Sequence, residues 1–298
     1  MFIEMATDYE PRLGPVIDTV STTLLSYVNP LISVKWGQCF PEGLYFPNTV
    51  AGCNNTATAL VTSYFEYPTY LPLTYDYADT TVVTLNWSAM KQHIKGSNSY
   101  ALHTGCNATV EAHKNIGRLV RQIARFNRSQ FYYHNSHLPW NTPLPYSYTD
   151  YVVDPYVSMT YTTTYNIYRL NALDTLGYTH TTPTTYTTKC TQSYLNNHWL
   201  VLMFGEAISP LYPDPVGHSW VVDGYKYYQY VIVNYNLVNP VPQTTYSYYN
   251  HINWGWDGDS NGYFLDGVFA AHKAKTYDSS QHSSTYSFYN LEITAVHL

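Results

Sequence analysis

Apolar residues near the start of the chain repeat at the spacing of an amphipathic helix. From Ala57 to Phe65 they fall at i, i+3, i+4, i+7 and i+8, which places them on one helix face. Pro68 then ends the pattern, because proline does not continue a helix. The sequence therefore predicts a helix that starts close to the tripeptide Gly-Cys-Asn at residues 52–54.

The same spacing returns in the segment 111–127. Its apolar positions form one stripe, made of Ala112, Ile116, Leu119, Val120 and Ile123. Arg118, Arg121 and Arg125 fall outside that stripe, so we expect these three side chains to face solvent. The segment 128–150 has prolines at positions 139, 143 and 145 and is predicted to cross between two parts of the fold.

The second half of the chain is strand-like. After a short predicted helix within 162–178, apolar runs alternate with Gly, Pro, Asn and Asp turns. The predicted strands are "WLVLMF", "HSWVVDGY", "YYQYVIVNY", "NHINWGW", "GYFLDG" and "YNLEITAVHL". Helices followed by an antiparallel sheet indicate the α+β class.

Composition excludes several classes of function. The chain has 298 residues, enough for one large domain or two packed lobes, and only 11% of them are charged. The chain has 14 basic and 20 acidic residues, and the basic residues form no cluster, so no nucleic-acid partner is expected. The apolar run "WLVLMFGEAI" is too short for a membrane span and contains a glutamate.

The start of the chain, "MFIEMATDYEPRL", lacks the basic and apolar regions of a signal peptide. Two interpretations stay open: a cytoplasmic protein, or a trimmed form of a longer precursor.

The four cysteines are too few and too scattered for a disulfide scaffold or a CxxC metal site. The segment "DGDSNG" at 257–262 resembles the start of a calcium-binding loop, but Val268 stands where the bidentate glutamate is required. A polar hairpin turn is the better interpretation. We therefore expect no metal and no cofactor.

Two cysteines, Cys53 and Cys106, each follow a glycine at the start of a helical pattern. A helix N-terminus favours a thiolate through its free N–H groups and its dipole. Gly52 further allows close approach of a ligand to the backbone. Neither feature separates the two cysteines, so neighbouring motifs must decide between them.

Those motifs favour Cys53 as the nucleophile. Gln38, in "VKWGQCF", is an amide donor suited to stabilising an oxyanion. His218 enters a strand on which Trp220 and Val222 share its face, and a histidine held there can act as general base and acid. No such motifs accompany Cys106, which is interpreted as a packed thiol. Cys39 is interpreted either as a simple neighbour of Gln38 or as a disulfide partner.

The motif "NHINWGWDGDSNGYF" supplies further candidates. Trp254 and Trp256 are suited to shielding a thiolate–imidazolium pair from water. Strand alternation places His251 and Asn253 on the face opposite Trp254, so His251 is interpreted as structural. Asn253 is considered as a hydrogen-bond partner in the cleft.

The ordered motifs "WGQ…AGCNNTATAL…YP", "GHSWVVDGY" and "HINWGWDGDSNGYF" resemble the streptopain family of bacterial cysteine peptidases, within the papain-like superfamily. The resemblance runs from about residue 30 to the C-terminus. It implies that Cys53 is the nucleophile, His218 the general base and acid, and Gln38 the oxyanion-hole donor. It also makes Trp254 the aromatic neighbour of the histidine, in place of the asparagine of papain, and Gly217 a backbone contact for bound peptide.

The resemblance also implies an architecture. We expect a papain-like two-lobe fold over 31–298, with a helical lobe at about 31–140 carrying the nucleophile helix and a β-rich lobe at about 141–298 carrying the histidine. Residues 1–30 are then an N-terminal extension, a remnant of the family's inhibitory pro-segment. By the same resemblance the protein is secreted or periplasmic and acts on proteins or peptides, with a preference for an apolar side chain two residues before the scissile bond.

Three positions depart from the family pattern. Asn54 and Asn55 replace the Val-Ala that usually follows the nucleophile, and Leu60 replaces a glutamine. The asparagines are expected to alter the cleft, and Leu60 to change packing only. Two rival functions therefore stay open: a catalytically silent papain-like fold that binds protein, and a glycan-binding module built on the sheet, which is rich in the chain's 34 tyrosines.

Overall fold

The computed structural model describes residues 17–46, 50–72, 82–92, 109–133, 136–138, 161–208, 215–235, 241–280 and 284–298. Its helices are α1 (Cys53–Phe65), α2 (Trp87–Met90), α3 (Val110–Phe126), the 3-10 turn η2 (Asn166–Tyr168), α4 (Asn171–Leu176) and α5 (Thr188–Asn196). The predicted helices after residue 53, over 111–127 and within 162–178 are confirmed. Helix α1 ends one residue before Glu66, whose left-handed backbone (φ 51°) closes the last turn two residues ahead of Pro68.

The main sheet contains the long strands predicted for the second half of the chain. Its strands are β1 (Ile17–Val28), β7 (Thr179–His180), β8 (Thr184–Thr185), β9 (Leu200–Ala207), β10 (Val216–Asn234), β11 (Gln243–Asn253), β12 (Gly262–Leu265), β13 (Ala274–Tyr277) and β14 (Tyr289–His297). Their order is β13-β12-β11-β10-β9-β14-β7, with β1 on β10 and β8 on β14, and every pairing is antiparallel. Two small sheets are formed by β2 (Tyr70–Pro72) with β3 (Val82–Thr84), and by β5 (Ser136–Leu138), β4 (Gln130–Tyr133) and β6 (Tyr161–Thr163).

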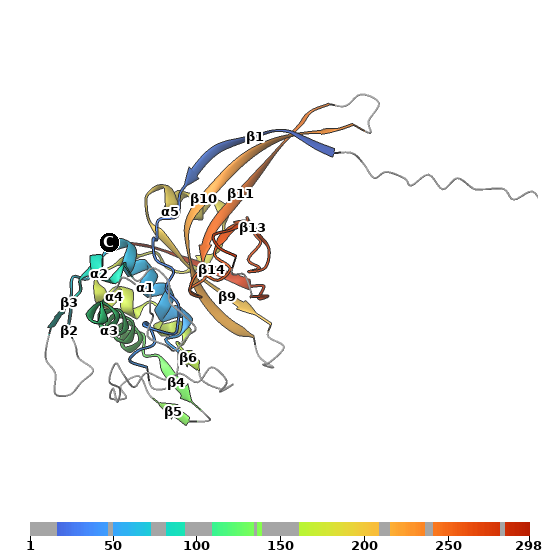
Figure 1. Ribbon diagram of the computed structural model, residues 1–298. Helices are drawn as coiled ribbons and strands as arrows, with labels where there is room; N and C mark the ends of the chain where they lie inside the picture. The colour runs from blue at the N-terminus through green and yellow to red at the C-terminus, as the bar shows by residue number, and fades with distance from the viewer. Residues whose placement is uncertain are drawn as a thin grey trace, which may run out of the picture.

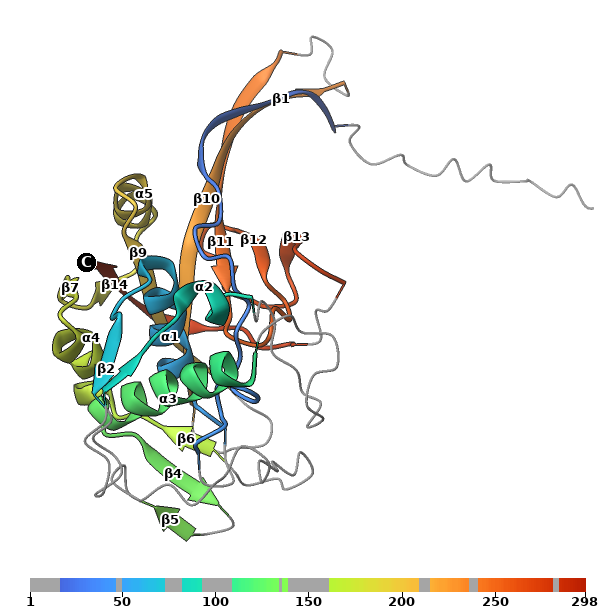
Figure 2. The ribbon, with the colours of Figure 1, turned by 60° about the vertical axis from the view of Figure 1, so that its left-hand side comes forward.

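Strand alternation gives the main sheet two buried faces. Leu202 and Val221 join a hydrophobic cluster with residues of α1 and α3, including the fully buried Leu60. Met203 and Trp220, one position away, belong to a second cluster that includes α5. Helices α1 to α4 accordingly lie on one side of the sheet and α5 on the other (Figures 1 and 2).

Strand β10 is longer than predicted. The runs "HSWVVDGY" and "YYQYVIVNY" form one continuous strand of 19 residues, because β11 pairs with it from Val221 to Ile232. Its outer half, with β1 and β11, projects from the body as a three-stranded arm (Figures 1 and 2). After β1 the chain leaves this arm and continues toward Gln38.

Arg121 contradicts the expectation that the three arginines of α3 face solvent. It is 1% exposed and its guanidinium lies 5.7 Å from the centroid of the Phe46 ring. The segment around Leu44 covers this side of the helix, since a Cβ atom on Gly117, one turn before Arg121, would meet the Leu44 side chain at 3.0 Å. The predicted crossing over 128–150 begins instead with strands β4 and β5, and the rest of it lies outside the described residues.

A buried amide network fixes the start of α1. Asn55 donates to the Ala51 carbonyl (2.8 Å) and to Ser129 Oγ (3.0 Å), and it accepts from Asn127 Nδ2 (3.1 Å). Asn127 accepts in turn from the backbone of Ala172 (2.9 Å). Asn55 is therefore a link between α1, the end of α3 and the start of α4, which is why a polar residue is accommodated at a fully buried position.

Asn55→Ala is expected to lower the free energy of unfolding by about 1–3 kcal/mol, because it leaves buried polar groups without partners. Chemical denaturation of the purified variant measures the change. Asn197→Ala, at the exposed end of α5, is the matched control and should stay within about 0.5 kcal/mol of the parent protein. Equal stability of the two variants would contradict the role given to Asn55.

Candidate active site

The candidate nucleophile is the first residue of α1. Gly52 caps this helix with φ 88°, a conformation that glycine adopts readily. A Cβ atom on Gly52 would lie 3.1 Å from the Thr162 side chain, so the turn is also closely covered. Cys53 is partly exposed and lines a pocket of about 700 Å³. The helix N-terminus thus presents the thiol to an open space.

Gln38 is held beside this helix by backbone hydrogen bonds. Its carbonyl accepts from the Ala51 N–H (2.8 Å), and the carbonyl of Gly37 accepts from Thr56 Oγ1 (3.0 Å). Gly37 has no room for a side chain, because a Cβ atom there would lie 2.2 Å from Asp257 Oδ1. The predicted oxyanion donor is therefore fixed to the helix that carries Cys53.

His218 is oriented by a backbone carbonyl. Its Nε2 donates to the carbonyl of Trp254 (2.9 Å), which fixes the tautomer and leaves Nδ1 as the nitrogen for proton exchange. The imidazole stacks on Trp256 with ring centroids 4.6 Å apart and on Trp254 at 6.4 Å. Trp256 is thus the nearer aromatic neighbour, whereas Trp254 positions the histidine mainly through its carbonyl.

An aromatic wall surrounds this imidazole. Trp220 and Phe288 lie at centroid distances of 5.9 Å and 5.4 Å from His218. Trp254 and Trp256 stack on one another at 5.4 Å with an interplanar angle of 11°. The two predicted tryptophans and two further rings added by the fold thus cover one side of His218.

The pockets bring most of the predicted residues together. Gln38, His218, Gly217 and Trp256 line a pocket of about 520 Å³. Gly217 also lines the pocket that contains Cys53, so the two pockets meet at this residue. Trp254 lines neither pocket, because its side chain is fully buried within the aromatic wall.

Asn253 does not reach this cleft, contrary to expectation. Its Nδ2 donates to the Val34 carbonyl (3.0 Å) and its Oδ1 accepts from the Gly255 N–H (3.2 Å). Neither pocket described above is lined by it. Both ends of its amide are used by backbone, which makes it a residue that holds chain segments in place.

Ser219 is a contact that the sequence did not reveal. Its backbone N–H donates to the Cys53 sulfur, which ties β10 to the start of α1. Its Oγ also donates to Asn54 Oδ1 (3.4 Å), and Asn54 Nδ2 donates to the Arg169 carbonyl (3.0 Å). Asn54 therefore lies in the lining of the second pocket, while Asn55 turns inward.

The electrostatics of the site combine two opposing effects. Burial raises the pKa of the Cys53 thiol and lowers the pKa of His218 to about 4, so burial favours a neutral pair. Hydrogen bonds from the backbone N–H groups of Ser219, Asn54 and Cys53 act the other way and stabilise a thiolate. The arrangement suits a thiol that transfers its proton to His218 as it attacks.

Among the other features considered from the sequence, Cys39, Asp257 and Asp259 also line the pocket of about 520 Å³. Cys39, Cys53 and Cys190 are free thiols, and Cys106 lies outside the described residues. The segment 257–262 is the predicted turn between β11 and β12, closed by a bond from the Asp259 N–H to the Trp256 carbonyl (2.8 Å). Within the described ranges no group of three His, Cys, Asp or Glu residues is placed to hold a metal, and no helix is long and apolar enough to span a membrane.

Sequence comparison decides the family. The profile of the Peptidase C10 family, which includes streptopain and interpain, matches residues 33–264. The chain belongs to this family. It is therefore a cysteine-type peptidase, in agreement with the resemblance of its motifs. No curated protein matches the chain significantly in sequence.

One solved structure is similar in fold. The active wild-type interpain A cysteine protease of Prevotella intermedia is 19% identical, with a TM-score of 0.53 over 92% of this chain and 95% of that one. A fragment of Prevotella intermedia prointerpain A is 17% identical, with a TM-score of 0.48 over 92% of this chain and 72% of the fragment. The first of these similarities supports the mixed arrangement of helices and antiparallel sheet.

Cys39 is expected to resist alkylation in the native peptidase. Burial, followed by the charges of Asp257 and Glu42, raises the pKa of its thiol to about 12. At pH 8 iodoacetamide should therefore modify Cys39 more than about 100-fold more slowly than the exposed Cys190, as mapped by mass spectrometry. Unfolding in guanidinium should remove the difference, and equal native rates would show that the thiol is not protected.

Proposed function

We propose that this member of the Peptidase C10 family is an endopeptidase in which Cys53 is the nucleophile, His218 the general base and acid, and Gln38 the oxyanion donor. The observation that carries the proposal is the orientation of His218. Because its Nε2 is bonded to the Trp254 carbonyl, its Nδ1 is available on a strand whose next residue donates to the Cys53 sulfur. In this proposal the helices α1–α4 and the main sheet are the two lobes of a papain-like fold, and the cleft lies between them.

The first half of the reaction forms an acyl-enzyme. The Cys53 sulfur attacks the peptide carbonyl carbon while its proton passes to His218. The carbonyl oxygen becomes an oxyanion, which accepts from the Gln38 amide and the Cys53 backbone N–H. The protonated His218 then gives its proton to the departing amine nitrogen, the C–N bond breaks and a thioester remains.

The second half regenerates the enzyme. A water molecule attacks the thioester carbon and gives a proton to His218, and the same oxyanion donors stabilise the new intermediate. The C–S bond breaks, the carboxylic acid product leaves, and the proton returns to the Cys53 sulfur. Proteins or peptides are the substrates, and a pocket on either side of Gly217 fits a chain that extends past the scissile bond in both directions.

Reactivity of Cys53 toward a limiting haloacetamide near pH 6 tests the nucleophile. We expect selective labelling of Cys53, because in this proposal His218 accepts its proton as the sulfur attacks, whereas ordinary thiols with pKa values of about 8.5 are almost fully protonated at this pH and have no such base. His218→Ala should reduce this labelling at least about tenfold, whereas His198→Ala, an exposed histidine, should not change it. Equal slow labelling of all thiols in the parent protein would support a catalytically silent binding module instead.

Peptide hydrolysis tests the oxyanion donor. Gln38→Ala is expected to reduce kcat about 100- to 1000-fold with little change in KM, because the lost hydrogen bond strengthens only in the transition state. Gln192→Ala on α5 is the matched control, and Cys53→Ala sets the background rate. A Gln38 variant with the kcat of the parent protein would remove Gln38 from the mechanism.

A further inference from the structure

The segment from Asn29 to Gln38 links β1 to the cleft, so its position determines where the Gln38 amide lies. It runs closely over β10, since a Cβ atom on Gly224 would lie 2.8 Å from the Val28 carbonyl and 3.0 Å from the Pro30 nitrogen. The segment is then bound to the sheet mainly by side chains rather than by a strand ladder. The groups that bind it are candidates for positioning the oxyanion donor.

Asp223 binds the segment at two adjacent residues. Its carbonyl accepts from the Leu31 N–H and its Oδ2 from the Ile32 N–H, both at 3.0 Å. A register shift between β10 and β11 at Val222 and Gly224 leaves the backbone of Asp223 without a paired residue in the β10–β11 ladder. This bulge explains how a charged side chain in a buried strand is directed at a neighbouring segment.

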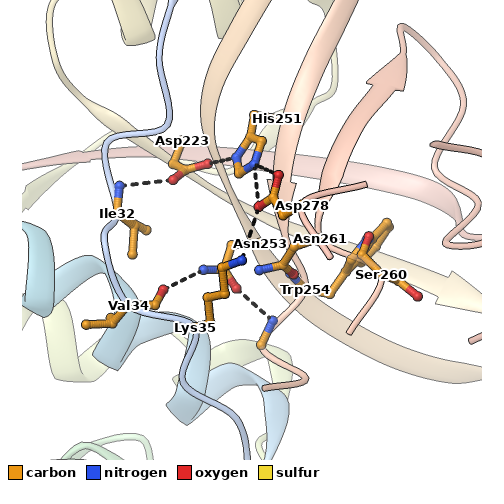
Figure 3. A network of polar contacts seen from close by, with 11 residues as sticks. Ile32, Val34, Lys35, Asp223, His251, Asn253, Trp254, Ser260, Asn261 and Asp278 are labelled. Carbon is orange, nitrogen blue, oxygen red and sulfur yellow. Dashed lines mark hydrogen bonds and ion pairs between the residues drawn. The ribbon is translucent and has the colours of Figure 1, made fainter. Parts of the chain in front are cut away.

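His251 joins this carboxylate to a second one. Its Nδ1 lies 2.5 Å from Asp223 Oδ1 and its Nε2 lies 3.1 Å from Asp278 Oδ2 (Figure 3). Both ring nitrogens face carboxylates, so the histidine is the cationic form that donates twice. Asp278 also lies 3.9 Å from Lys35 Nζ, which belongs to the same segment (Figure 3). Two cations and two anions therefore compensate one another.

Asn253 adds a third attachment from the same face of β11. Its Nδ2 donates to the Val34 carbonyl (Figure 3), and its Oδ1 accepts from the Gly255 N–H. Asn253 and Gly255 flank Trp254, whose carbonyl orients His218. The face of β11 with His251 and Asn253 thus contacts both the segment leading to Gln38 and the turn that holds His218.

We propose that the cluster Asp223–His251–Asp278, in which Asp223 and His251 are buried, is a positioning unit for the oxyanion hole: it sets the place of Gln38 through the segment 31–38. The proposal rests on the proposed function of Gln38. None of the three residues lines the pockets of the candidate site, so they act through the segment and not on substrate. A displacement of about 1 Å at a reacting group is enough to cost about 100-fold in rate.

His251→Gln is the first variant, because glutamine keeps a hydrogen-bond donor and removes the charge. We expect kcat for peptide hydrolysis to fall about 10- to 100-fold with KM within about twofold of the parent. The rate of Cys53 alkylation should stay within about twofold, because that reaction forms no oxyanion. His180→Gln is the matched control, since His180 pairs with the exposed Asp174 at 3.0 Å.

Hydrogen exchange provides a readout that does not depend on activity. Peptides covering 31–38 should exchange faster in the His251 variant than in the parent or the His180 variant, while peptides of α3 stay unchanged. Asp223→Asn should have the same effect, since the Ile32 N–H loses its anionic acceptor. These measurements use the full chain, with thermal unfolding to confirm that each variant is folded.

The outcomes separate the two proposals. Turnover by the parent protein that does not require Cys53 would contradict the proposed function itself. If turnover by the parent protein requires Cys53, a His251 variant with unchanged kcat would overturn the positioning role. Parallel loss of kcat and of Cys53 alkylation would also overturn it, because the cluster would then be supporting the whole site.

The pH dependence of stability is a second test, available even if the variant folds poorly. Burial lowers the pKa of His251, but the carboxylates of Asp223 and Asp278 outweigh it and raise this pKa from its ordinary 6.5 to about 9. Lys35, Lys226 and the Tyr263 ring are the other charged or titratable groups around the cluster.

A raised pKa means that the stabilisation is complete below pH 6.5 and is lost as pH rises through 9. The melting temperature and kcat of the parent should therefore fall together between about pH 8 and 10. A parent protein whose kcat falls while the protection of 31–38, corrected for the base-catalysed intrinsic exchange rate at each pH, stays constant over this range would contradict the proposal.

Discussion

Strand β10 pairs along both of its edges, and its register decides where the other parts of the site lie. Its inner half pairs with β9 from Val216 to Val222, β11 pairs with it from Val221 to Ile232, and β1 pairs with its outer half. A shift of the β10 register by one residue would turn His218 to the sheet face that α1 covers. It would also move Trp220 from the second hydrophobic cluster to the side of the first. Because three ladders fix the register, the imidazole, the Ser219 N–H and the Asp223 carboxylate keep fixed directions.

Buried polar groups do the rest of the positioning. Carboxylates and amides inside a fold are retained at a cost, since burying charge requires close compensation. In this peptidase they bind backbone groups of irregular segments: Asp223 at Ile32, Asn253 at Val34 and Asn55 at Ala51. Hydrophobic side chains would fill the same volume, but they would not direct a loop to one place.

The sequence predicted much of the fold and the segments that line the candidate site. Helical and alternating patterns are local, and so are the motifs around Cys53, Gln38 and His218, which the structure places along two pockets that share Gly217. The family assignment supports the peptidase class, and the roles of the individual residues stay proposals.

What the sequence did not predict depends on contacts between distant segments. Phe288 joins the wall around His218 only through the sheet, and Ser219 meets Cys53 only because α1 packs on β10. Arg121 is buried because another segment covers a face that its own helix pattern left polar. Strand alternation predicts the face of β11 on which Asn253 lies, but it does not predict which segment that face contacts. The expectation that Asn253 reaches the cleft was therefore wrong.

The separation of the site residues along the chain has a consequence for folding. Gln38 and Cys53 are made early, but the carbonyl that orients His218 belongs to Trp254, about 200 residues later. Strand β1 likewise finds its partner only after β10 has been synthesised. Contacts of such long sequence separation form slowly and late. On the ribosome, Cys53 and Gln38 are therefore synthesised long before His218 and the carbonyl that orients it.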